Sequence, residues 1–258
     1  EGSKETMAQS SGGLLAGKVA FVTGASRRIG RATALGLARE GADLLLNARS
    51  ARDEVEGVAA EVRALGRGAT VVMGDVTDEA SVQDMVEEAK AAHGRIDILV
   101  NNAAIRRQSP FTEMSYAEWR EIMAVILDGA FLMARGVLPV MIAGGGGTIV
   151  NIGGVSAHIG ARNRAHVAAA KAGIVGLTKA LAVEFADRKV TVNCLAPGKI
   201  GGERSKTAGE SPKMPAEILL GREGEIDEAA GMVVALCLPQ ARFMTGQTVH
   251  VSGGLYMP

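Results

Sequence analysis

Short apolar runs alternate with longer segments of helical periodicity along the whole chain, and this alternation constrains the fold more than any other feature. Most of the runs are uninterrupted Val, Ile and Leu, which is typical of parallel strands buried on both faces. Alternating strands and helices build a doubly wound parallel sheet. We therefore expect a single-domain α/β fold over residues 15–258, after an N-terminal arm of residues 1–14. The expected strands are 18–23, 43–48, 69–75, 96–102, 148–153, 190–196 and 248–253.

The composition excludes several classes of protein. Lys plus Arg equals Asp plus Glu at 28 each, so the chain lacks the cationic excess that sequence-independent nucleic-acid binding needs. Cys194 and Cys237 are too few for a secreted disulfide framework and lack zinc-ligand spacing, so no metal is expected. The longest apolar region, 124–143, is interrupted by Asp128 and Arg135, and no membrane span is expected there. No apolar signal core lies near the first residue, and we expect a cytoplasmic protein with a small-molecule substrate and no nucleic-acid or membrane partner.

A glycine-containing turn, TGASRRIG at 23–30, follows the first expected strand and opens a helix. This arrangement presents backbone N–H groups and a helix N-terminus to a pyrophosphate, as in dinucleotide-binding Rossmann folds. Gly24 can make the sharp turn, and Gly30 lets the helix lie against the strand. The candidate cofactor-binding residues in this turn are Gly24, Ser26, Arg27, Arg28, Ile29 and Gly30.

The end of the second expected strand, LLLNARS, bears on the choice of cofactor. Where an NAD enzyme keeps a carboxylate for the ribose 2′-hydroxyl, this chain has Ala48, followed by Arg49. Without the carboxylate there is no repulsion of a 2′-phosphate, and Arg49 with Arg27 or Arg28 can bind that group in bidentate fashion. We therefore expect NADP(H) to be preferred over NAD(H). The alternative is that these arginines are solvated surface residues.

Seven motifs in order carry a family resemblance: TGASRRIG (23–30), GDVTD (74–78), NNAA (101–104), IVNIGG (149–154), AKAG (170–173), VNCLAPG (192–198) and TGQTVHVSGG (245–254). On these motifs, residues 15–255 resemble a single-domain short-chain dehydrogenase/reductase. The resemblance implies that Asp75 and Val76 bracket the adenine. It also implies that Asn102 and Ala103 line the adenosine ribose, and that Pro197, Gly198 and Ile200 hold the nicotinamide carboxamide.

Two positions depart from the family's cofactor motifs. Arg28 replaces the middle glycine of the T-G-x-x-x-G-x-G pattern, and Gly202 stands where the P-G-x-I-x-T stretch has threonine. We expect arginine to adopt the required φ at the first helical turn without strain. Its charge beside the phosphates also favours NADP(H).

The catalytic positions depart further. The family reduces carbonyls or oxidises alcohols with a serine, a tyrosine, a lysine and an asparagine, and the resemblance places the lysine at Lys171. It implies that the tyrosine position holds Val167, the serine position Gly154 and the asparagine position Ile126. Since valine has no titratable hydrogen, it cannot supply the proton that the reaction requires. The resemblance leaves Lys171 a second role, as a hydrogen-bond donor to the nicotinamide ribose.

Three neighbours are candidates to replace the missing groups. His158 and Ser156 follow the expected fifth strand in a loop that could fold over the nicotinamide, and a histidine is a competent acid near neutral pH. His166 adjoins Val167, but one residue along a helix is a rotation of about 100°, so it should point elsewhere unless the helix start is distorted. The alternative for all three is a structural role as loop, cap or turn residues.

Two functions remain open. The first is an NADP(H)-dependent oxidoreductase that acts on a small carbonyl or alcohol with a non-standard proton donor, either a histidine or a water held by Lys171. The second is a catalytically inactive dinucleotide-binding paralogue that serves as a sensor or partner subunit. The irregular stretch 197–223 is expected to be a substrate lid, or else a disordered insertion. Apolar residues on more than one face of the expected helix 116–142 predict an oligomer. The resemblance implies a homotetramer in which this helix pairs with helix 162–186.

Overall fold

The computed structural model describes residues 13–202 and 216–258 and contains one sheet of seven parallel strands. Their order is β3-β2-β1-β4-β5-β6-β7, so the direction of winding reverses between β1 and β4. Every expected strand is present, with ends that differ by at most two residues. The strands are β1 (Val19–Val22), β2 (Asp43–Ala48), β3 (Ala69–Met73), β4 (Ile98–Asn101), β5 (Gly147–Ile152), β6 (Val190–Pro197) and β7 (Thr248–Val251). The doubly wound Rossmann fold is therefore confirmed, and ligands in such folds bind beyond the carboxyl ends of the strands at the reversal point.

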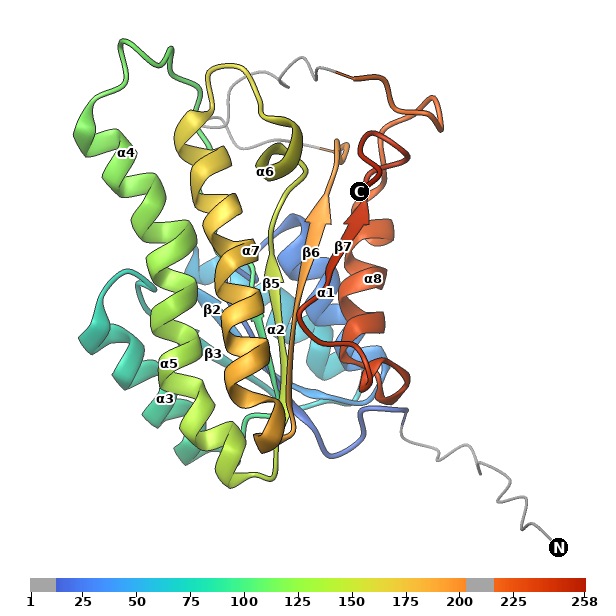
Figure 1. Ribbon diagram of the computed structural model, residues 1–258. Helices are drawn as coiled ribbons and strands as arrows, with labels where there is room; N and C mark the ends of the chain where they lie inside the picture. Colours follow the sequence, from blue (N-terminus) through green and yellow to red (C-terminus); the bar gives the residue numbers. More distant parts are fainter. Residues whose placement is uncertain (1–12, 203–215) are drawn as a thin grey trace, which may run out of the picture.

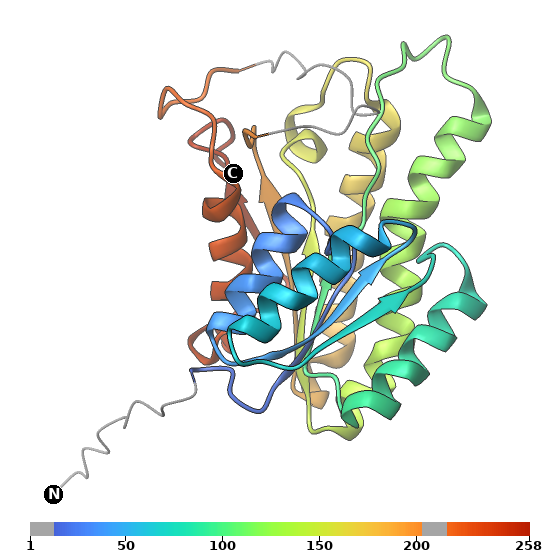
Figure 2. The same cartoon turned by 180° about the vertical axis from the view of Figure 1, so that it is seen from behind.

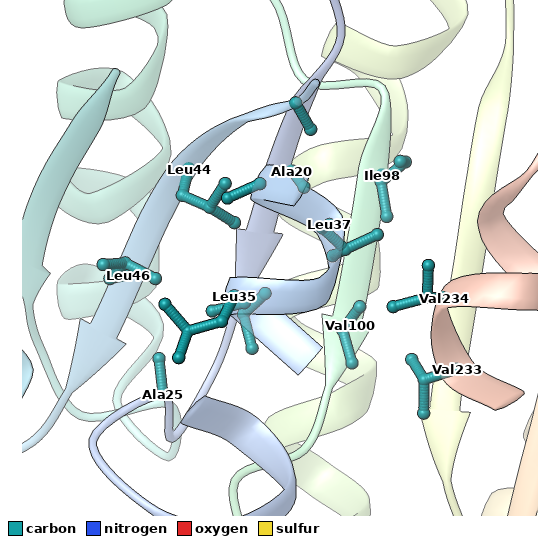
Figure 3. Packing of buried hydrophobic residues seen from close by; sticks show 14 of the residues in the cluster. Ala20, Ala25, Leu35, Leu37, Leu44, Leu46, Ile98, Val100, Val233 and Val234 are labelled. Carbon is teal, nitrogen blue, oxygen red and sulfur yellow. The ribbon is translucent and has the colours of Figure 1, made fainter. Parts of the chain in front are cut away.

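Helices cover both faces of the sheet (Figures 1 and 2). One face carries α1 (Arg28–Arg39), α2 (Arg52–Ala64) and α8 (Ile226–Cys237), and the other carries α3 (Glu79–His93), α4 (Tyr116–Met123), α5 (Gly129–Ala143) and α7 (Ala165–Phe185). Short helical turns occur at α6 (Ser156–Ile159), η2 (Ala186–Arg188) and η4 (Pro239–Ala241). On the first face, Leu37 of α1 packs among Leu44 of β2 and Ile98 of β4, and Val233 of α8 closes the layer (Figure 3). This packing fixes where the first helix, and so the glycine turn before it, lies above the sheet.

The expected helix 116–142 is present but is not one regular α-helix. A π-helical segment, η1 (Ala124–Asp128), separates α4 from α5, and Ile126 within it is buried. A π turn takes up one residue more than an α-helical turn, so the α-helical periodicity is interrupted at this point. Such turns occur often at functional sites.

Two helical segments, 116–143 and 165–188, are long and apolar enough to span a membrane by length and composition. Core helices that pack on a sheet share this property, and Met133, Val137 and Met141 of α5 are fully buried against the sheet. Other apolar side chains on these helices remain exposed, notably Phe131 at 46% and Val183 at 84%. A cytoplasmic location stays a prediction.

Two expected features lie partly outside the described residues. Of the expected arm, the structure describes Gly13 and Leu14. Of the expected lid 197–223, residues 203–215 lie outside the described part. An isolated parallel β-bridge joins Ile200 of that segment to Gly224, the residue after it.

Candidate active site

A cavity opens at the carboxyl ends of β1 to β4, where the order of the strands reverses. The glycine turn forms one wall, and the segments that follow β2, β3 and β4 form the others. Its lining includes ten of the predicted cofactor residues: Gly24, Ser26, Arg27, Arg28, Ile29, Arg49, Asp75, Val76, Asn102 and Ala103. We call this the nucleotide cavity.

The glycine turn is fixed by hydrogen bonds from the neighbouring strand. The Asn102 side-chain amide donates to the carbonyl oxygens of Thr23 and Gly24, both at 2.9 Å. Gly24 has φ of +62°, and a Cβ on Gly30 would lie 2.3 Å from the Gly24 carbonyl oxygen. Both positions therefore require glycine.

The start of α1 fits a pyrophosphate. Within the described part of the chain, no side chain caps this helix and its first turn contains no acidic residue. The first N–H groups of a helix lack partners inside it and carry partial positive charge. The turn and the helix start together supply the donors that a dinucleotide pyrophosphate needs.

Arg28 corrects one expectation. Its φ is +50°, in the left-handed region, so the prediction of an unstrained arginine was wrong. The turn demands the conformation that glycine adopts freely, and a residue with a Cβ pays roughly 1 kcal/mol to adopt it. The Arg28 guanidinium donates from Nη2 to the carbonyl oxygens of Ile200 at 3.3 Å and Gly201 at 3.0 Å. A Cβ on Gly202 would lie 3.3 Å from Arg28 Nη1, so the arginine occupies space beside the expected threonine position.

After β2, Arg49 is exposed and lies close to an acidic residue. Arg49 Nη1 is 3.7 Å from Asp75 Oδ2, and its side chain is 59% exposed. Asp75 is held in turn by hydrogen bonds from the backbone N–H and hydroxyl of Thr77. An exposed ion pair of this length contributes little stability, so the Arg49 guanidinium can turn to another anion.

A second cavity lies at the ends of β5 and β6, and Arg28, Ile29 and Arg106 line both cavities. We call it the reaction cavity. Its volume is about 100 Å³, well below the roughly 300–1,000 Å³ of sites for drug-sized ligands. It also contains the predicted residues Ser156, Lys171, Pro197, Gly198 and Ile200.

Lys171 is the central titratable group of the reaction cavity. Its side chain is buried, and Nζ donates a hydrogen bond to the carbonyl oxygen of Ile152. Burial, and then the positive charge of Arg106, lower the pKa of Lys171 to about 7. Lys171 can therefore exist as either ammonium or amine at neutral pH.

Val167 and Gly154 lie on the wall beside this lysine. Val167 is one helical turn before Lys171 on α7 and is buried. A Cβ on Gly154 would lie 3.9 Å from Lys171 Cγ and 3.7 Å from Ser156 Oγ, which is ordinary contact. The site therefore has room for a side chain at position 154. Ile126 lines a small neighbouring cavity that also touches Lys171.

The two candidate histidines are not part of the reaction cavity lining. The His158 ring contacts the rings of His250 and Tyr256, with centroids 4.5 and 5.0 Å away. His166 is completely buried, and its Nε2 lies 3.3 Å from Glu118 Oε1 on α4. As the 100° rotation predicts, His166 points away from Val167. Of the four catalytic candidates, Lys171 and Ser156 are brought together and the histidines are not.

Two cavity residues, Arg106 and Arg164, were missed by the sequence analysis. Arg164 is the residue before α7 and has φ of −138°, so the periodicity of the helix does not give the direction of its side chain. Arg106 lies in the irregular segment after β4, where no periodicity indicates a direction. Among the described residues there is no group of three potential His, Cys, Asp or Glu metal ligands.

Comparison with known proteins agrees with this architecture. The family model for enoyl-(acyl carrier protein) reductase matches residues 24–256. The 3-oxoacyl-[acyl-carrier-protein] reductase FabG of Staphylococcus aureus (strain Mu50) is 37% identical over 242 residues, covering 93% of this chain and 98% of the relative. FabG of Escherichia coli (strain K12) is 39% identical over 243 residues, with the same shares covered. The crystal structure of acetoin dehydrogenase from Enterobacter cloacae gives a TM-score of 0.84 at 36% identity and covers 93% of this chain and 98% of that one. The chain therefore belongs to the short-chain dehydrogenase/reductase family of oxidoreductases.

Proposed function

We propose that the protein is an NADP(H)-dependent oxidoreductase for a small carbonyl or alcohol, with Lys171 as the proton donor in place of a tyrosine. The main observation in support of this proposal is that Lys171 lies in the wall of the reaction cavity, with Val167 one helical turn before it. The histidines considered from the sequence point to other elements, which favours the lysine over them.

Preference for NADP(H) rests on the residues after β2. Ala48 and Arg49 line the nucleotide cavity at the position where a carboxylate would select NAD(H). Arg27 lines the same cavity and is exposed. A 2′-phosphate between Arg27 and Arg49 would make charge-assisted hydrogen bonds and would draw Arg49 away from Asp75. Arg28 contributes less, because its guanidinium is held by the carbonyl groups after β6.

When bound, NADPH would provide the hydride that reduces the carbonyl carbon. In the reductive direction, the Lys171 ammonium then transfers one proton to the substrate oxygen and becomes a neutral amine, which solvent reprotonates. The pKa of about 7 suits this role, since an acid with a pKa near the working pH is the most effective. Ser156 lies on the same wall and can hydrogen-bond the substrate oxygen. Gly154, Val167 and Ile126, at the positions where the resemblance places serine, tyrosine and asparagine, make this an atypical member of its family.

A second candidate is a dinucleotide-binding protein without redox turnover, acting as a sensor or partner subunit. The observation in its favour is that Val167 and Ile126 are buried apolar residues packed together. In that case, the two positions where the family has a tyrosine and an asparagine would have become part of the hydrophobic core.

One experiment separates the two candidates. The protein is incubated with NADPH and a panel of ketones, imines and enones, and loss of the reduced-nicotinamide absorbance is followed for the wild type and for Lys171→Met. The enzyme proposal expects turnover with at least one substrate and its loss in Lys171→Met. NADPH binding without turnover on any substrate would favour the second candidate. Turnover that is retained in Lys171→Met but lost in His158→Ala would instead identify His158 as the proton donor.

A further inference from the structure

Lys171 is the one lysine of the described chain that is buried without a carboxylate partner. Its exposed fraction is 5%, and no carboxylate of residues 13–202 and 216–258 lines either of the two cavities that Lys171 touches. The other described lysines are paired with carboxylates or exposed: Lys18 with Asp97, Lys90 with Glu87 and Lys199 with Glu223 are pairs, and Lys179 and Lys189 are exposed. The fold therefore supplies no carboxylate to hold Lys171 as an ammonium.

The hydrogen bond that Lys171 does make is compatible with a neutral amine. Nζ donates to the carbonyl oxygen of Ile152, which is an uncharged acceptor. An amine keeps N–H groups for this bond and gains a lone pair that the ammonium lacks. Burial and the charge of Arg106, which lower the pKa of Lys171 to about 7, favour the same form. The contact with Ile152 can thus hold the side chain in place while the nitrogen is nucleophilic.

The surroundings of Lys171 suit a reaction with a carbonyl compound. Val167 lies one helical turn before it in the wall of the reaction cavity, and Ile126 lines the small neighbouring cavity. Neither side chain has a polar atom that could hold the amine. Ser156 lines the reaction cavity as well and can donate a hydrogen bond to a carbonyl oxygen. A lysine that is desolvated beside another cation is a recurrent arrangement for nucleophiles that form Schiff bases.

We propose that Lys171 Nζ is a nucleophile that condenses reversibly with a short, uncharged aliphatic aldehyde in the reaction cavity to form an imine. The nitrogen lone pair forms the C–N bond while the carbonyl π pair moves to the oxygen, and a proton passes from nitrogen to that oxygen. Loss of water from this carbinolamine forms the C=N bond. One aldehyde and one amine give one imine and one water, so no oxidant or reductant is needed. Val167 and Ile126 favour an apolar chain on the aldehyde. This inference goes beyond the proposed function, because it needs neither a cofactor nor hydride transfer.

Reductive trapping detects the imine without any turnover. The full-length chain, without added cofactor, is incubated with butanal and sodium cyanoborohydride near neutral pH, and peptide mass mapping locates the butylated lysines. We expect Lys171 to be labelled about tenfold or more faster than Lys179, because its surroundings favour the amine form. Lys179 is the internal control, since it is exposed on the same helix α7. The preference for Lys171 should shrink in alkaline solution, where lysines in general lose their protons.

Native mass spectrometry without the reductant is the second measurement, so that poor access of cyanoborohydride cannot hide the imine. The expected species is the protein plus one butanal less one water, present in the wild type and in Lys179→Met and absent in Lys171→Met. Faster labelling of Lys171 or this Lys171-dependent adduct would support the proposal. Labelling of Lys171 no faster than that of Lys179, with no such adduct, would overturn it.

The failure of this inference is distinguishable from that of the proposed function. The proposed proton donor is the ammonium form of Lys171 and the nucleophile is the amine, so raising the pH favours the imine and disfavours reduction. Labelling of Lys171 without any NADPH-dependent turnover would support this inference and count against the proposed function. Turnover without an imine at Lys171 would do the reverse.

Discussion

Arg28 Nη2 donates a hydrogen bond to the carbonyl oxygen of Gly201 at 3.0 Å and so joins the turn after β1 to the loop after β6. The same arginine has φ of +50°, so its side chain makes a useful contact from a strained backbone. We expect Arg28→Gly to be more stable than Arg28→Ala by about 1 kcal/mol, because both lose the contact and only glycine relieves the strain. Urea denaturation of the two variants measures this difference. Equal stabilities would mean that the turn relaxes around a Cβ.

Arg49 is predicted to be the main determinant of cofactor choice. Arg49→Ala should weaken NADPH binding about tenfold or more, since a charge-assisted hydrogen bond to the 2′-phosphate is worth roughly 1.5–3 kcal/mol. NADH binding should stay nearly unchanged, because the Arg49–Asp75 pair that is also lost is exposed. Titration of cofactor fluorescence gives both constants. Arg52→Ala is the control, as this exposed arginine on α2 lies outside the nucleotide cavity. Equal loss for both cofactors would move the 2′-phosphate site elsewhere.

The pH dependence of turnover should follow Lys171. Its pKa is lowered to about 7, so the ammonium form that donates a proton predominates below neutral pH and disappears above it. With a neutral ketone, kcat for reduction should therefore be high on the acid side and fall about tenfold per pH unit once the pKa is passed. A rate that rises with pH in the reductive direction would contradict Lys171 as the donor.

Restoring the family's catalytic groups should raise ketone reduction. The variant combines Gly154→Ser, Val167→Tyr and Ile126→Asn. General acid catalysis contributes roughly 10²–10⁴ in rate, and Lys171 is already one turn from the new tyrosine. The open space at position 154 accommodates the serine. Val167→Tyr alone should do little, because grouped catalytic residues act as a unit. Steady-state assays of the single and triple variants test this, and a triple variant that folds and binds NADPH yet stays at the parent's rate would argue against the assignment of these positions.

We predict a homotetramer in which the outer faces of α5 and α7 meet their copies. Phe131 and Val183 are exposed on these neighbouring helices, and burying them between subunits would remove apolar area from water. Val183→Glu should therefore lower the association state in sedimentation equilibrium. Leu65→Glu, at an exposed leucine after α2 on the opposite face, should not. A wild-type monomer at micromolar concentration would refute the prediction.

The sequence predicted the sheet and the cofactor turn well because both depend on local signals. Buried parallel strands are continuous apolar runs, and a glycine turn between strand and helix is a contiguous motif. The conformation of Arg28 was predicted wrongly because the prediction also used a local signal: it assigned Arg28 the φ of the first turn of the helix that follows the motif. The sequence also did not show that the start of this turn is held by the Asn102 amide, which lies far away in the sequence.

The reaction cavity was less predictable because its walls come from distant segments. Nothing near His158 indicates that its ring will pack against His250 and Tyr256, and nothing near His166 reveals Glu118. Arg106 is likewise brought to Lys171 by the fold alone. Arg164 precedes α7 with non-helical dihedral angles, so helical spacing could not predict its place either.

The π turn at Ala124–Asp128 changes how the long helix can tolerate insertions and deletions. It takes up one residue beyond what an α-helix would use, and so rotates α5 relative to α4 by about the 100° that one residue spans. Ile122 of α4 faces α7, whereas Met133 of α5 faces the sheet beside α3. Removing a single residue from this turn would straighten the helix and force the two apolar stripes into one line, so that only one could meet its partner. The number of residues in this turn is therefore as much a part of the packing as the apolar side chains on either side of it.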